Sequence, residues 1–254
     1  MAFRSSNPTL KDTAFENLHS ADSANQMTIT GTVNKTGFLL LLVIASAAMV
    51  WSQAMPLLAQ NIMPSWLMPT MIGGALGGFV MAIIVMAKKE SAGVTAPIYA
   101  VIEGLFLGAV SAMYASAYEG IVMQAVGLTF GVFLTLLMLY KAGIVRATEK
   151  FKTGIMAATG GIMIVYLVSF VMGFFNGGVG IGVLSAATPM GIGISLVIVT
   201  IAALNLILDF DFIEKASEAG APKYMEWYGA FGLMVTLVWL YLEILRLLSK
   251  LNRR

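Results

Sequence analysis

The chain has 254 residues, of which 59% are hydrophobic and only 11% are charged. Because a soluble domain carries about 25% charged residues, this composition excludes a water-soluble globular protein and predicts an integral membrane protein. The net charge of +2 gives no electrostatic basis for nucleic-acid binding, while the lack of cysteine and the single histidine, His19, exclude disulfides, thiolate chemistry and His-based metal clusters.

The first 36 residues are polar and form the first predicted unit of the chain. They are rich in Ser, Asn, Asp and Thr, and they lack the short apolar core and the small-residue cleavage site of a signal peptide. We therefore expect residues 1–36 to be a polar N-terminal tail. Residues 37–254 are expected to form one transmembrane domain.

Seven apolar runs follow the tail, each long enough to cross a bilayer as a helix, which takes about 20 residues. The Gly-rich stretch 176–182, between the fifth and sixth runs, is expected to be a loop or a broken segment. The sequence therefore predicts an all-α polytopic membrane helix bundle with seven transmembrane helices. In chain order, the runs are residues 37–55, 67–87, 94–117, 120–140, 154–175, 189–212 and 227–248.

Glycines four residues apart recur in these runs. This spacing lets helix backbones approach each other closely in a membrane. Several such pairs arise by chance in a chain with 26 glycines, but together they favour a compact bundle. The pairs are Gly73/Gly77, Gly74/Gly78, Gly104/Gly108, Gly127/Gly131 and Gly173/Gly177.

Basic residues lie after the second, fourth and sixth runs and are absent after the first, third and fifth. Lys and Arg in short loops favour the cytoplasmic side, so we expect a cytoplasmic N-terminus. The basic C-terminal residues then lie outside, against the rule. Either the seventh run is re-entrant or partial, or the earlier connectors dominate. The basic residues are Lys88, Lys89, Lys141, Arg146, Lys150, Lys152, Lys215 and Lys223 in the connectors, and Arg246, Lys250, Arg253 and Arg254 near the C-terminus.

Glu103 lies near the middle of the third run, where an ionised carboxylate is costly. One interpretation is a protonated side chain satisfied by a neighbouring helix backbone, since a buried carboxyl group usually becomes neutral. The other is a lining group of a proton or cation path. The sequence leaves both open.

Two aspartates, Asp209 and Asp211, come at the end of the sixth run. Asn205 lies four residues before Asp209 and shares its helix face, whereas Asp211 points roughly the opposite way. One interpretation is that both aspartates have reached the membrane interface and end the helix. The other is that Asp209, between apolar neighbours, is desolvated and acts as a pH sensor or cation ligand. We favour the first for Asp211 and the second for Asp209.

Glu243 and Arg246 are three residues apart in the seventh run, a spacing that suits an ion pair within one helix. The sequence contains no His-Glu metal motif, no phosphate-binding Gly-Lys-Ser/Thr loop and no Ser nucleophile with a His base. We therefore expect neither an enzyme nor a bound cofactor, and the sequence assigns no metal site.

The runs that carry these acids resemble those of the Bax inhibitor-1 (transmembrane Bax inhibitor motif) family. The similar segments are Glu103-Gly104, Ala-Leu-Asn-Leu-Ile-Leu-Asp at 203–209, and the seventh run from 230 to 248. The resemblance covers about residues 35–250. It implies a bacterial inner-membrane member with six helices around a central seventh, and a pH-sensitive calcium leak.

The chain departs from that family at the partner of Asp209. The resemblance implies a second aspartate on helix seven that shares a proton with the first, and Thr236 stands at that position here. Aligning the run on Glu243 instead supplies an acid, but Glu243 lies about ten residues further along, or roughly 15 Å deeper. The acidic counterpart of the family's basic residue after helix two is also missing, with Gly77 and Gly78 nearby.

Two functions follow as hypotheses. The first is a cation-conducting protein, most simply a calcium leak, gated by protonation near Asp209 with Glu103 along the path. The second is a non-conducting membrane regulator that binds a protease or stress-response complex through the tail and the connector 141–152. Proton-coupled transport is a third, but the sequence has no inverted-repeat signal.

Overall fold

The computed structural model describes residues 25–175 and 180–253 of the chain. Within these residues seven helices are long and apolar enough to cross a membrane, and no strand is present. The prediction of an all-α polytopic bundle is therefore confirmed. The long helices are α2 (Ile29–Leu58), α3 (Leu67–Ala87), α4 (Ala92–Ala117), α5 (Ile121–Lys141), α6 (Glu149–Phe175), α8 (Pro189–Glu218) and α9 (Met225–Asn252), with the short η2 (Lys89–Ser91) and α7 (Gly182–Ser185) between them.

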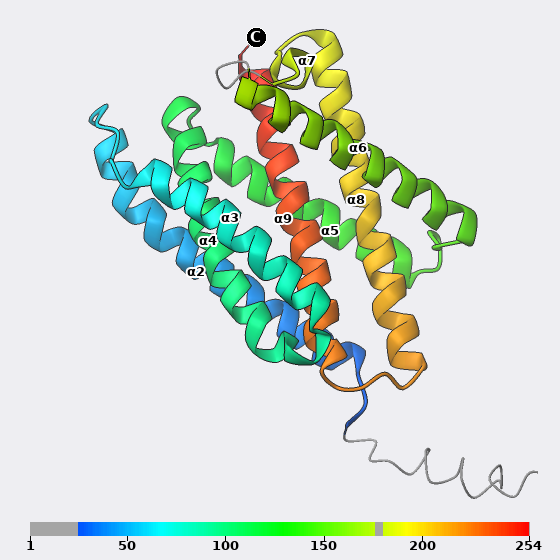
Figure 1. The fold of residues 1–254 in the computed structure, drawn as a ribbon. Helices are drawn as coiled ribbons and strands as arrows, with labels where there is room; N and C mark the ends of the chain where they lie inside the picture. The colour runs from blue at the N-terminus through cyan, green and yellow to red at the C-terminus, as the bar shows by residue number, and fades with distance from the viewer. Residues whose placement is uncertain (1–24, 176–179, 254) are drawn as a thin grey trace, which may run out of the picture.

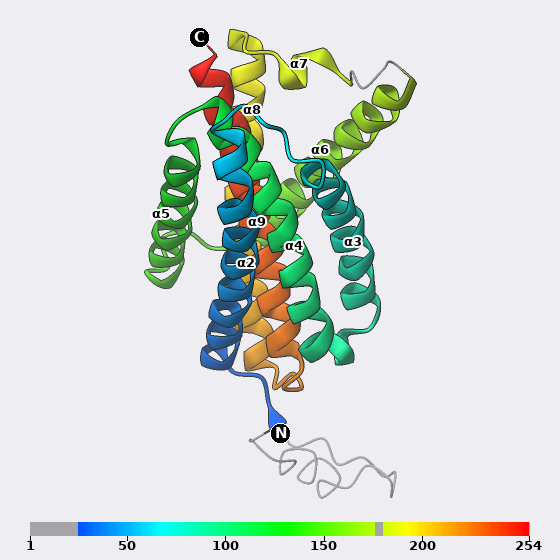
Figure 2. The same cartoon turned by 90° about the vertical axis from the view of Figure 1, so that its left-hand side faces the viewer.

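The last helix, α9, lies at the centre of the bundle. It packs against α2, α4, α5 and α8, while α3 packs mainly on α4, and α6 mainly on α8 (Figures 1 and 2). More than half of the apolar stretch of α9, 56%, is buried inside the protein, against 6% for α6. The core is therefore built around α9, and the outer helices present their apolar side chains to the lipid.

The N-terminal end of α2 and the α8–α9 connector lie at one end of the bundle, and the C-terminus and α7 lie at the other (Figure 1). α9 is a continuous helix of 28 residues. A re-entrant or partial seventh segment, one of the two explanations offered for its basic C-terminal end, is therefore not observed.

Two helices are longer than their apolar runs. α2 begins at Ile29 rather than near residue 37, because the Thr28 side chain caps the helix by accepting a hydrogen bond of 2.9 Å from the Gly31 backbone. The hydroxyl groups of Thr32 and Thr36 donate to carbonyl oxygens one turn earlier, at 3.0 and 2.9 Å, so these polar residues are satisfied within the helix. α8 continues past residue 212 to Glu218. The polar residues at both ends extend the helices instead of ending them.

Glycine sets the distance between α2 and α4. A Cβ atom at Gly104 would collide with the side chain of Ser46 and the carbonyl oxygen of Val43, and one at Gly108 would lie 2.5 Å from the Ala47 carbonyl oxygen. Gly74 and Gly78 bring α3 equally close to α4. Cβ atoms at Gly127 and Gly131, in contrast, would meet nothing within 4 Å.

Candidate functional site

Asp209 lies inside α8 and faces α9. Its Oδ2 atom is the one buried side-chain nitrogen or oxygen, among the described residues, that has no hydrogen-bond partner. The Thr236 side chain of α9 lies beside the carboxyl group. Buried Leu206, Phe210 and Ile213 make its surroundings apolar. Asp209 does not end the helix, and the residue beside it, Thr236, is the one that stands at the partner position implied by the family resemblance.

Asn205 is held by a different helix. Its side-chain amide donates to the Thr159 hydroxyl of α6 at 2.9 Å and to the Ile201 carbonyl oxygen at 2.8 Å. Asn205 shares a face of α8 with Asp209, but neither of these hydrogen bonds involves the Asp209 carboxyl group. Its role in the structure is to fasten α6 to α8.

Asp211 forms an ion-pair group that joins the beginning of α6 to α8. Its Oδ2 atom lies 2.7 Å from Lys152 Nζ and 3.1 Å from Lys215 Nζ. Lys152 also contacts Glu149, at 3.2 Å. The expectation that Asp211 ends the helix is therefore wrong, because α8 continues for two more turns.

A second group of contacts joins α5 to α8 close to Asp211. The hydroxyl of Tyr140 donates to Glu214 of α8. The ring of Phe210 packs beside the rings of Tyr140 and Phe133, with centroids 5.7 and 5.9 Å apart. Asp209 is thus enclosed between α9 on one side and these contacts of α5, α6 and α8 on the other.

Glu103 is buried in α4 on the opposite side of α9. Only 8% of the residue is exposed, and a Cβ atom at Gly78 of α3 would lie 2.6 Å from its Oε2 atom. Tyr99, one turn earlier on the same helix, lies beside the carboxyl group.

The parallel register of α4 and α9 places Glu103 at the depth of Thr236. The Tyr99 ring packs edge-on against Phe231, 5.0 Å between centroids, and the Ser111 hydroxyl lies 2.7 Å from the Tyr241 hydroxyl. Glu103, one turn after Tyr99, is therefore level with the turn of α9 that carries Thr236. Glu103 and Asp209 lie at one depth on two sides of the central helix.

Glu243 takes part in the ion pair that the sequence predicts. The side chain is almost fully buried, its Oε1 atom lies 3.0 Å from Arg246 Nη1, and it accepts a hydrogen bond of 2.8 Å from the Tyr166 hydroxyl of α6. Arg246 also donates to that hydroxyl. Glu243 is committed to this triad, so Thr236 and not Glu243 is the residue of α9 beside Asp209.

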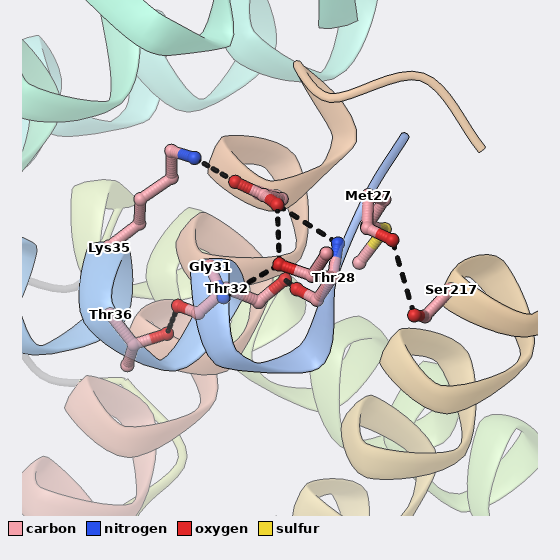
Figure 3. Close-up of polar contacts among 8 residues, drawn as sticks. Met27, Thr28, Gly31, Thr32, Lys35, Thr36 and Ser217 are labelled. Carbon is pink, nitrogen blue, oxygen red and sulfur yellow. Dashed lines mark hydrogen bonds and ion pairs between the residues drawn. The ribbon is translucent and has the colours of Figure 1, made fainter. Parts of the chain in front are cut away.

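A buried ion pair at the start of α9 was not predicted. Glu226 Oε1 accepts hydrogen bonds of 2.9 Å from the backbone and the hydroxyl of Thr28, and its Oε2 atom accepts one from Lys35 (Figure 3). Gly31 allows this approach, since a Cβ atom there would collide with the carboxylate. The available sequence signal was Thr28, a helix-capping residue before an apolar run, but nothing indicated its distant partner.

The residues before α2 extend this contact to the α8–α9 connector. The Met27 backbone donates to the Ala221 carbonyl oxygen at 2.7 Å, and the Ser217 hydroxyl donates to the Met27 carbonyl oxygen at 3.2 Å (Figure 3). Gln26 pairs with Pro222 as an isolated β-bridge. Residues 25–36, expected as tail, are thus part of the folded domain over the described chain.

Together these features define a multi-pass membrane protein whose described residues place buried acids on the central helix α9 and on α4 and α8 beside it. The described residues contain no group of three His, Cys, Asp or Glu side chains able to hold a metal ion. The chain matches the family model described as Bax inhibitor 1 like over residues 7–253, and it belongs to that family. No curated protein and no solved structure matches it.

Proposed function

We propose that this protein is a cation leak channel, with calcium as its cargo, whose conduction depends on the protonation of Asp209. The observation that supports the proposal is the buried Oδ2 atom of Asp209, which lacks a hydrogen-bond partner in the described chain. A carboxyl group in such a place is most stable as the neutral acid. Its ionisation requires water, a cation or a rearrangement, and each of these opens the contact between α8 and α9.

The Thr236 hydroxyl distinguishes the two protonation states. Its oxygen lies 3.3 Å from the Gly232 carbonyl oxygen, to which the hydroxyl proton can be directed. The oxygen then accepts the proton of a neutral Asp209. When Asp209 is ionised, the Thr236 hydroxyl must turn to donate to it instead. The Thr236 hydroxyl thus takes the place of a second carboxylate, because it can accept a hydrogen bond from the neutral acid or donate one to the ionised form.

In this proposal, the ion pairs and the hydrogen bond between Asp209 and the C-terminal end of α8 keep the cation path closed. Asp211 binds Lys152 and Lys215, and Glu214 binds Tyr140, so that α5, α6 and α8 are joined there. We infer that a hydrated, ionised Asp209 loosens this joint and that cations then pass between α8 and α9. Glu103 lies at the same depth but on the other side of α9, so in this proposal it affects the path between α8 and α9 only through α9.

Calcium flux into liposomes at about pH 6 and about pH 8 tests the proposal. Wild-type flux is expected to differ between the two pH values. The Asp209→Asn variant is expected to lose this difference and to match the wild type at the lower pH, because asparagine carries no charge. Glu90→Gln, which alters an exposed side chain of η2 at the same end of the bundle, is the control and should keep the wild-type pH dependence. Equal flux in wild type and Asp209→Asn at both pH values contradicts the proposal.

The alternative is a non-conducting regulator that binds a protease or stress-response complex. The exposed basic side chains Lys141, Arg146 and Lys150, at the connection between α5 and α6, support it. The tail deletion that tests it must end at residue 24, because Thr28 and Met27 belong to the folded domain. Loss of a co-purifying partner on that deletion, without any calcium flux in the wild type, favours the regulator.

We further propose a cytoplasmic N-terminus in a bacterial inner membrane. The basic connectors after the second, fourth and sixth helices support this orientation. The basic residues at the end of α9 do not weigh against it, because they are engaged within the protein. Arg246 binds Glu243, Lys250 binds Ser195, and Arg253 binds Tyr118.

A further inference from the structure

A second polar region, away from Asp209, surrounds a cavity at the C-terminal end of α9. The cavity has a volume of about 1100 Å³ and lies between α6, α7 and the last turns of α9. Three cations line it, Arg246, Lys250 and Arg253, and the described lining residues include no acid. Figure 1 shows α7 beside the C-terminus at this end of the bundle.

The positive charge of this cavity exceeds the negative charge around it. Glu243 neutralises Arg246. Lys250 is 2% exposed, and its ammonium group donates to the Gly191 carbonyl oxygen at 2.9 Å and to the Ser195 hydroxyl at 2.7 Å. Both acceptors are neutral. Arg253 donates to the Tyr118 hydroxyl at 2.9 Å, which is neutral as well.

The three cations are also close enough to repel one another. Arg246 and Arg253 both act on the charge of Lys250. Burying an ammonium group without a counter-ion is costly, and a cavity that gathers two further guanidinium groups around it adds to that cost. An anion bound in the cavity would supply a counter-charge for Lys250 and would offset the repulsion among the three cations.

The donors that remain suit a phosphate group. A guanidinium group has five N–H donors in a planar fork that matches the oxygens of phosphate. Arg246 uses its Nη1 atom on Glu243 and Tyr166, and Arg253 uses its Nε atom on Tyr118, so both keep further donors. Lys250 keeps one of its three N–H donors.

The size and walls of the cavity indicate what the phosphate carries. Ligand pockets usually measure about 300–1000 Å³, so a cavity of about 1100 Å³ holds more than a bare phosphate ion. Phe170, Ile181 and Leu184 supply apolar surface beside the cations. We propose that this cavity binds the phosphate group of an anionic ligand through Arg246, Lys250 and Arg253. The headgroup of an anionic phospholipid and free phosphate share this chemistry.

Thermal melting of the full-length protein in a non-ionic detergent tests the site and separates the two sources. The probes are dihexanoylphosphatidylglycerol, dihexanoylphosphatidylcholine, inorganic phosphate, and chloride at matched ionic strength. A saturable rise in melting temperature with the anionic lipid, beyond that with the zwitterionic lipid, identifies a lipid headgroup site. A rise with inorganic phosphate alone identifies a free-anion site. No rise above the chloride control overturns the proposal.

Arg253→Gln provides the matched variant, because its side chain is exposed near the end of α9 and its loss leaves the helix core intact. Removing one charged hydrogen-bond donor is expected to weaken the apparent affinity about tenfold. The control is Lys150→Gln, which removes an exposed positive charge near the start of α6, at the opposite end of that helix from the cavity. Equal weakening in both variants means non-specific attraction of anions and contradicts the site.

Discussion

Replacing Glu243 by alanine is expected to destabilise the protein more than any other change at the charged residues of α9. The side chain is 1% exposed, and it holds Arg246 and the Tyr166 hydroxyl of α6. Removing one partner of a buried ion pair costs about 3–5 kcal/mol, and the 37% exposure of the Arg246 side chain places this loss at the lower end of that range. We expect a loss of that size in the free energy of unfolding, measured as a fall in melting temperature of at least about 6 °C.

A double-mutant cycle separates the pair from the packing. Glu243→Gln and Arg246→Met each leave one partner unmatched, whereas the double variant removes both charges. The double variant is therefore expected to be more stable than the sum of the single effects predicts. Additive effects would show that the ion pair contributes nothing, and that the burial of Glu243 is a matter of shape alone.

Glu226→Ala is expected to release the N-terminal segment from the start of α9. The carboxylate accepts two hydrogen bonds from Thr28 and one from Lys35, and it is almost fully buried. We expect a loss of about 2–3 kcal/mol in the free energy of unfolding, because the Lys35 side chain is 18% exposed and regains contact with water. Thermal melting measures the loss, and limited proteolysis near Met27 should become faster.

Two controls accompany this variant. Glu226→Gln keeps the shape and an acceptor oxygen for Thr28, so it should lose less stability than alanine. Glu149→Gln changes an 86% exposed glutamate of a surface pair and should leave the melting temperature unchanged. Unchanged proteolysis and melting in Glu226→Ala would show that the cap contacts of α2 do not hold the N-terminal segment.

The helices were predictable because hydropathy alone decides which segments enter a membrane. The runs at 67–87 and 189 onward begin where α3 and α8 begin. The start of α2 was misplaced, because Thr32 and Thr36 are polar by type and yet satisfy their hydroxyl groups within the helix. A hydropathy profile scores each residue by its type, so it does not detect hydrogen bonds of this kind between a side chain and the backbone.

The site was predictable where the family resemblance or a local spacing fixes it. The resemblance placed Thr236 opposite Asp209, and a three-residue spacing paired Glu243 with Arg246. The contacts of Asp211 with Lys152, and of Glu226 with Lys35, join residues far apart in the sequence. Local spacing carries no information about such pairs.

Glycine spacing was informative in part. Gly104 and Gly108 lie against the backbone of α2, whereas Cβ atoms at Gly127 and Gly131 would meet nothing within 4 Å. The same four-residue separation occurs in both pairs, because a glycine-rich chain produces it by chance. Only the position of the neighbouring helix separates a packing glycine from one that faces lipid.

We propose that Asp209 exchanges a proton and that its surroundings change with it. Infrared difference spectra of the protein in lipid bilayers, between about pH 6 and about pH 8, test this exchange most directly. We expect a carbonyl band of a protonated carboxyl group that is lost at the higher pH in the wild type and is missing from the spectrum of Asp209→Asn. Identical difference spectra of the wild type and Asp209→Asn would contradict it.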